Sequence, residues 1–360
     1  MKPGLAALLV LSGCSTAPDL ERARAELLAL HAEQRRVHLE EDAAGFAALL
    51  DEGYVELRDG ALLRPTRSEL EARFREYFAA VEFLAWDDVD VPAIELSRDG
   101  TLATVAVTKL VRTRPEGDEH GPIARALFAW LATCNRHAEG WRITQVASTR
   151  APQGAKTSLA ALRHALGGAA RIRALQGVRA RYEARSPQGS PYAIALDLPA
   201  QGPWTIAWHY PGQPAAAFEL EGHEGWSLAP DGARSALPSS EAEMVRSHAF
   251  PWLVLAPESF LPGLESEGPF DEGGRWLERL STGHGSALVL DLATDLPARL
   301  ELVDEREGAA RTVTVRFEAW RREAGLLVPA RVVAVDAKGE WTMELGALEL
   351  RGAPLEPDPR

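Results

Sequence analysis

Apolar residues recur near helical spacing at the beginning of the chain. Between residues 20 and 39 they stand among glutamates and arginines, which is typical of a helix with one buried side. Thr66 and Glu69 have the spacing of a capping box at the start of a later helix. Helices are therefore predicted over residues 20–39, 42–50 and 67–80.

The hydrophobic period changes to two after the third helix. Residues 102–112 are rich in valine and threonine, and turn formers at Asp99-Gly100 and Glu139-Gly140 separate neighbouring segments. This pattern predicts an antiparallel sheet with strands over residues 54–57, 93–96, 102–112, 126–136 and 141–148. The stretch 150–157 then has turn formers and no apolar period, so it is the best domain boundary.

The rest of the chain is mostly a succession of short β segments. Helices are expected at 158–174, thinned at Gly167-Gly168, and at 240–248, where Ser240 and Glu243 suggest a capping box and Pro251 ends the helix. The loop 281–286 is expected to join a helical segment to a strand. Strands are predicted over residues 178–184, 191–198, 204–210, 215–221, 226–229, 286–292, 298–304, 311–320, 327–335 and 340–350.

These segments predict an α+β chain with two domains, which a length of 360 residues allows. The first domain would cover residues 20–149, as a curling antiparallel sheet with three helices. The second would cover 158–352, followed by a tail at 353–360. So many meandering strands most easily form a half-open antiparallel barrel around their own core, with capping helices.

The amino terminus has the layout of a secretory signal. Lys2 precedes an apolar run from Leu5 to Leu11, which is far shorter than the roughly 20 residues that a membrane-spanning helix needs. Small residues and then Cys14 follow this run. The stretch resembles a bacterial lipoprotein lipobox, which implies a signal peptide over residues 1–13 and lipidation of Cys14.

The lipobox resemblance also implies a location. Residues 14–19 would form a short tether, and the acyl chains on Cys14 would hold the protein to a membrane. Ser15 stands where an aspartate tends to retain lipoproteins in the inner membrane. We therefore expect the periplasmic face of the outer membrane, or the cell surface if the organism has no outer membrane.

Composition excludes some classes of partner. The net charge is −13 and no basic stripe stands out, so a nucleic acid partner is not expected. Of the two cysteines, lipidation of Cys14 would leave Cys134 alone, without an internal disulfide. Cys134 lies in an apolar strand pattern and is predicted to be buried.

Residues 20–149 resemble the SnoaL-like, nuclear-transport-factor-2-like fold. The resemblance rests on residues 42–50, the helix that opens at Thr66, and the segment 140–148. It implies a cone in which a bent sheet wraps around a long helix. Members of this class include isomerases, cyclases and dehydratases, and also non-catalytic domains that bind ligands or form homodimers.

An enzyme of that class needs carboxylates, tyrosine or histidine inside the cone for proton transfer. The candidates are Tyr54, Asp87, Asp88 and His31. Against a catalytic role, three acids fall within residues 87–90, which suggests a solvated loop or strand edge. His31 and His38 are seven residues apart on one helix, which is too far for a pair of metal ligands. No catalytic dyad is identified.

The second domain resembles the LolA-like lipoprotein-handling fold. The matching features are the helix leading into 172–178, the strand 204–210 with its hairpin, the segment 291–298, and the strand entry at 325–329. The resemblance implies a half-barrel that holds acyl chains or other apolar ligands. Two roles remain open for the aromatic residues, core filling or cavity lining: Trp204, Trp208, Trp226, Phe250 and Trp252.

No motif predicts a metal site, a cofactor or a nucleophile. The histidines of the second domain are isolated, and the loop 281–286 lacks the setting of a nucleophile elbow. The leading hypothesis is a non-enzymatic, membrane-anchored lipoprotein that binds an apolar or amphipathic ligand or a partner protein such as another lipoprotein. The alternatives are an enzyme using the cone pocket and a dimerising scaffold.

Overall fold

The computed structural model describes residues 19–58, 60–304 and 311–352. The expected signal peptide, Cys14, most of the tether and the tail 353–360 lie outside the described residues. In the described part of the chain, no helix is both long and apolar enough to cross a membrane.

The chain is α+β, as predicted, and its internal contacts divide it into two compact units. Among the described residues, the first unit comprises 19–79, 92–107 and 129–149. The second unit comprises residues 80–91, 108–128, 150–304 and 311–352. The contacts thus assign to the second unit two segments that the sequence pattern groups with the first domain.

The first three helices are α1 (Leu20–Leu39), α2 (Ala43–Leu49) and α3 (Arg67–Phe78). Asp19 and Asp42 accept hydrogen bonds from backbone N–H groups in the first turns of α1 and α2. The predicted capping box is confirmed, because the Thr66 N–H donates to Glu69 Oε2 at 2.7 Å and the Glu69 N–H donates to Thr66 Oγ1 at 3.3 Å.

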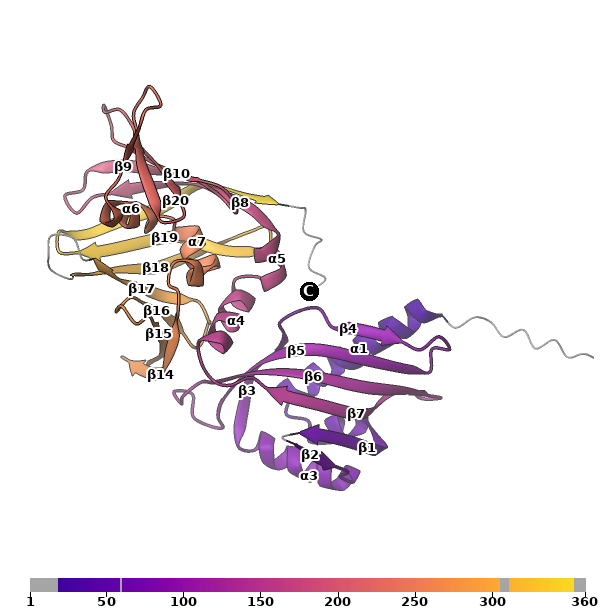
Figure 1. Ribbon diagram of the computed structural model, residues 1–360. Coiled ribbons are helices and arrows are strands. Elements are labelled where there is room, and N and C mark those ends of the chain that lie inside the picture. Colours follow the sequence, from indigo (N-terminus) through magenta and orange to yellow (C-terminus); the bar gives the residue numbers. More distant parts are fainter. Residues whose placement is uncertain (1–18, 59, 305–310, 353–360) are drawn as a thin grey trace, which may run out of the picture. The chain divides into compact units, whose positions relative to one another are not determined.

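The first sheet has the strand order β2-β1-β7-β6-β5-β3, and β4 also pairs with β5 (Figure 1). Its strands are β1 (Leu50–Arg58), β2 (Ala61–Leu63), β3 (Val81–Asp88), β4 (Ala93–Leu96), β5 (Leu102–Pro115), β6 (Ala124–His137) and β7 (Gly140–Arg150). The prediction of a wholly antiparallel sheet is wrong, because β1 runs parallel to β7. These strands lie far apart in the sequence, and no local pattern encodes the direction of so distant a partner.

The second unit contains an open sheet of thirteen strands, all in antiparallel pairs, with the order β13-β12-β11-β10-β9-β8-β20-β19-β18-β17-β16-β15-β14. The strands of the first half are β8 (Leu175–Arg185), β9 (Pro191–Pro199), β10 (Trp204–His209), β11 (Ala216–Glu221), β12 (Glu224–Leu228) and β13 (Arg234–Ala236). Those of the second half are β14 (Glu265–Glu272), β15 (Arg275–Ser281), β16 (Ala287–Asp291), β17 (Pro297–Asp304), β18 (Arg311–Glu323), β19 (Leu326–Asp336) and β20 (Gly339–Gly352).

This strand order has a simple path (Figure 1). The chain enters at the middle of the sheet with β8 and meanders to one edge at β13. A helical crossover then carries it to the opposite edge at β14, and it meanders back to β20, which pairs with β8. The crossover contains α6 (Ser239–Arg246), α7 (Phe250–Leu255) and the short helix η1 (Pro257–Ser259). Because α6 packs against β11 and β12 and α7 against β19, the crossover contacts both halves of the sheet.

Three local expectations in this unit are wrong. The helix α6 begins at Ser239 after Pro238 and has no side-chain cap, so Ser240 and Glu243 do not form a capping box. Pro251 does not end a helix but stands in the first turn of α7, where its missing N–H has no intrahelical role. The segment before the loop 281–286 is not helical but forms β15, whose direction and pairing come from its neighbours in the sheet.

The helix α4 (Ala155–Ala165) and the helix α5 (Ala169–Ala174) precede β8. The predicted break between them is confirmed, because Gly167 and Gly168 both have positive φ angles, 117° and 104°. The Gly167 position also excludes a side chain, since a Cβ there would lie 2.2 Å from the Gly325 carbonyl oxygen.

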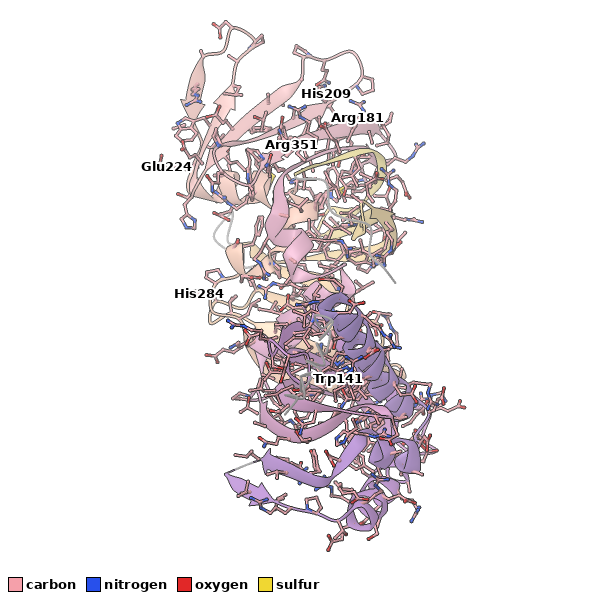
Figure 2. The ribbon with its side chains drawn as sticks, turned by 90° about the vertical axis from the view of Figure 1, so that its right-hand side faces the viewer. Trp141, Arg181, His209, Glu224, His284 and Arg351 are labelled. Atoms are coloured by element: carbon pink, nitrogen blue, oxygen red, sulfur yellow. The ribbon has the colours of Figure 1, made fainter. Side chains whose placement is uncertain are left out.

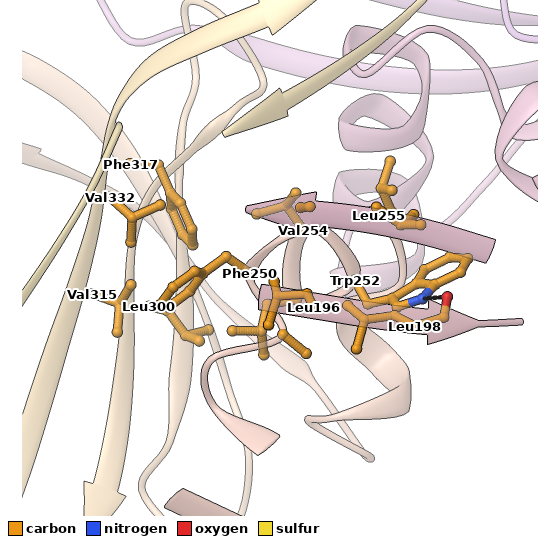
Figure 3. Close-up of a cluster of buried hydrophobic side chains, with 14 of the residues drawn as sticks. Leu196, Leu198, Phe250, Trp252, Val254, Leu255, Leu300, Val315, Phe317 and Val332 are labelled. Carbon is orange, nitrogen blue, oxygen red and sulfur yellow. Dashed lines mark hydrogen bonds between the residues drawn. The ribbon is translucent and has the colours of Figure 1, made fainter. Parts of the chain in front are cut away.

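The core of the second unit lies between the crossover helices and the sheet (Figure 3). Phe250 of α7 points toward Leu300 and Val315, whereas Trp252 points toward Leu198. The Trp252 Nε1–H donates to the Leu198 carbonyl oxygen at 3.2 Å. The helix α7 is buried along its whole length, which explains why its sequence is a continuous apolar run.

Candidate ligand-binding cavity

A cavity of about 650 Å³ lies in the second unit. Its size falls within the roughly 300–1,000 Å³ of typical small-molecule sites. One side of the wall is formed by α6, α7 and the two residues after η1, Phe260 and Leu261. The other side is formed by strands of both halves of the sheet. Among the apolar side chains of the wall are Leu302, Val313, Val315, Ala334 and Met343. The cavity is therefore a product of the long crossover, which approaches the sheet without filling all the space beside it.

Aromatic side chains form part of this wall. The rings of Tyr192 and Tyr210 stack at 5.3 Å, and Trp341 meets Tyr192 edge-on at 6.2 Å. Trp208 lies 5.2 Å from the ring of His248. Burial raises the pKa of Tyr192, and the neighbouring Tyr210 adds to that shift, so the phenol stays neutral at ordinary pH.

The charged residues that line the cavity are two acids and two bases: Glu243, Arg246, Asp336 and Lys338. The Arg246 Nε–H donates to Glu243 Oε1 at 3.3 Å. Asp336 accepts hydrogen bonds from the Lys338 backbone N–H at 2.8 Å and from Trp341 Nε1 at 3.4 Å. The charges on the wall therefore balance.

Two donors of the wall stand out because they are buried without a partner. Neither Arg246 Nη2 nor Trp208 Nε1 has a hydrogen-bond acceptor among the residues that the structure describes. A buried donor without an acceptor is unfavourable, and most such groups in folded proteins are paired. The Arg246 guanidinium lies 6.0 Å from the ring of Trp204, which is outside the lining, so this group is covered by protein.

The five aromatic residues singled out in the sequence separate into two groups. Trp208 and Phe250 line the cavity. Trp204, Trp226 and Trp252 lie outside its lining: Trp204 donates to the Pro199 carbonyl at 3.0 Å, and Trp226 lies beneath the Arg234 guanidinium. Core filling and cavity lining thus both occur, at different positions.

The candidate catalytic residues lie in two different units. Tyr54 of β1 is 5% exposed in the first unit, and burial raises the pKa of its phenol. Asp87 and Asp88 belong to the second unit and end β3, which is an edge strand of its sheet, so of the two expectations, a solvated loop or a strand edge, the structure has the strand edge. Asp88 forms an ion pair with the buried Lys109 of the neighbouring β5, and Asp87 Oδ2 lies 3.6 Å from His164 Nε2. The ion pair of Asp88 therefore joins β3 to its neighbour β5.

The histidines of α1 lie among aromatic rings. His38 is surrounded by Phe46, Phe74 and Phe78 at ring distances of 5.0, 6.0 and 5.9 Å. Its Nδ1 lies 2.7 Å from the Gln34 carbonyl oxygen. This histidine therefore packs as part of an aromatic cluster.

Cys134 is buried in β6, as predicted, with 1% of its surface exposed. Burial raises the pKa of its thiol to about 12. The thiol is therefore protonated and unreactive near neutral pH.

Sequence reasoning missed a buried ionic cluster in the second unit. The Arg125 guanidinium, 4% exposed, pairs with Asp295 at 2.9 Å and with Glu278. Ser158 donates to Glu278 Oε2 at 2.7 Å. Burial lowers the pKa of Arg125 and raises that of Asp295, and their mutual attraction opposes both shifts. The members come from distant parts of the chain, so no local motif could have indicated the cluster.

Histidines of the second unit do not converge on a metal site. Figure 2 shows that His209, at the end of β10, and His284, in the turn between β15 and β16, are well separated. Within residues 19–58, 60–304 and 311–352, no group of three histidine, cysteine or acidic side chains is arranged to hold a metal ion.

Comparison with known proteins gives a limited result. No family model matches the chain, and no curated protein matches it. Solved structures similar to the first part of the chain include an NTF2-like protein with a cystatin-like fold from Novosphingobium aromaticivorans. That protein is 19% identical, with 39% of this chain and 90% of that chain covered and a TM-score of 0.31.

Two further solved structures have similar values. ActVI-ORFA from Streptomyces coelicolor is 19% identical, with 35% of this chain and 96% of that chain covered and a TM-score of 0.30. A conserved protein from Planctomyces limnophilus is 14% identical, with 37% and 99% covered and a TM-score of 0.32. Similarity at these scores does not establish a function.

Proposed function

We propose that this protein is a membrane-anchored envelope lipoprotein that holds an apolar or amphipathic ligand in its second unit. The observation that carries the proposal is the cavity of about 650 Å³, with an apolar wall built from both halves of one sheet. Burial of apolar ligand surface there would contribute roughly 25 cal/mol per Å². The role is binding, with no chemical step.

The proposed architecture follows the two sequence resemblances. The second unit is proposed to be a LolA-like half-barrel, which agrees with an open meander whose crossover helices contact both halves of the sheet. Residues 20–149 are proposed to be SnoaL-like. Lipid on Cys14 would tether both to the periplasmic face of the outer membrane.

Filling the cavity tests the binding role. Val313→Trp places an indole in the cavity, because Val313 lies in its wall. Val332→Trp is the matched control, since Val332 is fully buried in the adjacent strand and lies outside the lining. The measurement is titration with an environment-sensitive naphthalene dye. We expect the natural protein and a folded control to bind it, and Val313→Trp to bind at least about tenfold more weakly, a loss of about 1.4 kcal/mol.

Unchanged dye binding by Val313→Trp would contradict the assignment of the ligand to this cavity. An independent check is organic extraction and mass spectrometry of protein purified without detergent, where we expect a co-purifying amphiphile.

The anchor has a separate test. Cells expressing the natural chain are expected to incorporate radiolabelled palmitate into the protein, and cells expressing Cys14→Ser are not. The variant should also leave the membrane fraction. Equal labelling of both chains would remove the anchor from the proposal and leave the cavity untouched.

A further inference from the structure

The charged side chains at the exposed end of the cavity indicate the head of its ligand. Resting on the proposed function, we infer that the ligand is a zwitterionic amphiphile with a phosphate and an ammonium group in its head, as in a phospholipid. The phosphate lies at Lys338, and the ammonium lies at Asp336 and the aromatic rings beside it. The hydrocarbon chain lies against the apolar wall.

The polar part of the lining lies at an exposed end of the cavity. Lys338 and Tyr210 are exposed, Asp336 and Trp341 are half-buried, and all four line the cavity. Asp336 ends β19, and Lys338 lies in the turn before β20. Much of the apolar lining is by contrast almost fully buried: Phe250, Leu253, Leu261, Val315 and Met343. A ligand therefore meets charged groups at the entrance and hydrocarbon inside, as an amphiphile requires.

Asp336 and Lys338 have opposite charges, and both are available to a ligand. Within the part of the chain that the structure describes, neither side chain has an oppositely charged group within 4.0 Å. The other two charged lining residues form a pair, with Arg246 Nε 3.3 Å from Glu243 Oε1. The lining thus offers a ligand one negative and one positive side chain.

One charge of each sign favours a head that carries both. The two side chains belong to one turn, in which the Lys338 backbone N–H donates to Asp336 Oδ1 at 2.8 Å. A purely anionic head at Lys338 would be repelled by Asp336, and a purely cationic head at Asp336 would be repelled by Lys338. A zwitterionic head meets each side chain with the opposite charge.

The rings beside Asp336 determine which end holds the ammonium. Trp341 Nε1–H donates to Asp336 Oδ1 at 3.4 Å, and the Trp341 ring meets that of Tyr192 at 6.2 Å. Tyr192 stacks on Tyr210 at 5.3 Å, so the second face of the Tyr210 ring is turned away from it, and Tyr210 is 37% exposed. Ammonium groups are attracted to the faces of tyrosine and tryptophan rings. The carboxylate among these rings therefore suits the ammonium, and Lys338 suits the phosphate.

The test compares four dodecyl probes on the full-length natural protein, each below its critical micelle concentration. Dodecylphosphocholine is zwitterionic, dodecyl phosphate is an anion, dodecyltrimethylammonium is a cation and dodecyl maltoside is neutral. Each probe displaces the bound naphthalene dye. We expect half-displacement by dodecylphosphocholine at a concentration about three- to tenfold lower than by any other probe, since it gains an ion pair and a cation–π contact together.

Each result has a defined meaning. Strongest displacement by the anion, the cation or the neutral probe, or equal displacement by all four, would overturn the zwitterionic head while leaving an apolar binding site. Failure of the dye and of all four probes to bind would overturn the proposed function itself, and with it this inference.

Two variants assign the two charges. Lys338→Gln is expected to weaken binding of the zwitterion and the anion about threefold and to leave binding of the cation no weaker. Asp336→Asn keeps an oxygen for the Lys338 N–H, and it should weaken binding of the zwitterion and the cation and leave that of the anion no weaker. The reverse pattern would overturn the orientation of the head.

Each variant has a matched control outside the lining. Lys156→Gln removes an exposed lysine of α4. Asp271→Asn alters an exposed aspartate that accepts the Gly274 N–H at 2.8 Å in a hairpin turn, much as Asp336 does in its own turn. Neither control should change probe binding. A preference for the zwitterion that survives in both lining variants would overturn the assignment, and the comparison of probes on the natural protein stands even if one variant fails to fold.

Discussion

Two arginines of the second unit are withdrawn from solvent, and their surroundings differ. Arg125 contacts two buried carboxylates, those of Asp295 and Glu278. Arg246 contacts one carboxylate, Glu243, which is 56% exposed, and its Nη2 is without an acceptor in the described residues. The Arg125 guanidinium thus has acceptors within the protein, whereas one nitrogen of the Arg246 guanidinium, Nη2, has none among the described residues.

The difference separates a guanidinium held between two buried carboxylates from one with a single, largely exposed carboxylate partner. A buried ion pair that is broken on one side leaves an uncompensated charge, so its loss affects the free energy of unfolding. A buried donor with no internal partner is itself unfavourable, so its removal should lower the free energy of unfolding little.

The largest effect is expected at Arg125. Arg125→Met would take the cation from the buried Glu278 and leave Asp295 with Arg112 alone, at 3.5 Å, and would lower the free energy of unfolding by about 3–5 kcal/mol. Urea denaturation followed by circular dichroism measures this change. A loss below about 1 kcal/mol would show that the two arginines do not differ as described.

The next prediction compares a valine in the packed core, Val332, with a valine in the cavity wall, Val313. Val332→Trp is expected to lower the free energy of unfolding by about 1–3 kcal/mol, because Val332 is fully buried in a packed region. Val313→Trp should cost distinctly less, since the added ring enters the cavity. Chemical denaturation of both variants provides the comparison, and equal losses would contradict the presence of usable space beside Val313.

Arg246→Met is the counterpart of Arg125→Met, and the two are compared by their free energies of unfolding. The free energy of unfolding is expected to change by no more than about 0.5 kcal/mol, because Glu243 remains largely exposed to solvent and an unpartnered donor is removed. The same denaturation experiment measures it. A loss as large as that of Arg125→Met would identify Arg246 as a structural residue.

The smallest effect concerns the reactivity of the Cys134 thiol, which is tested without a substitution at Cys134. Cys134 is a buried group whose pKa is raised to about 12, so in a Cys14→Ser chain its thiol should react with a disulfide reagent at about pH 8 only after unfolding. Because the folded state holds this proton more tightly, the corresponding stability is present below the unfolded pKa of about 9 and is lost as pH rises toward about 12. Rapid labelling of the native chain would contradict the burial.

Local patterns were sufficient where an element depends on its own residues. The box at Thr66 and Glu69 was predictable because both bonds form within one turn of helix. A similar spacing at Ser240 and Glu243 failed, because Pro238 precedes the helix and moves its start to Ser239. The sequence before the loop 281–286 favours a helix, whereas the partners of β15 on both sides in the sheet make this segment a strand.

At the cavity too, the sequence indicates some of the lining residues and not others. Trp208 and Phe250 were identified from sequence as possible lining residues, because large aromatic side chains in a β-rich segment turn inward. Arg246 was not, since one arginine at the end of a predicted helix carries no signal of burial. Its role depends on how α6 meets the strands.

The sequence by itself determined the helices up to α6 and most strands, the buried Cys134 and the α+β class, because hydrophobic period and turn chemistry act over a few residues. Only the tertiary structure decided that β1 runs parallel to β7, that Arg125 gathers distant carboxylates, and that the crossover from β13 to β14 leaves a cavity. These features depend on contacts between residues far apart in the chain, and such contacts are set by the packing of whole elements.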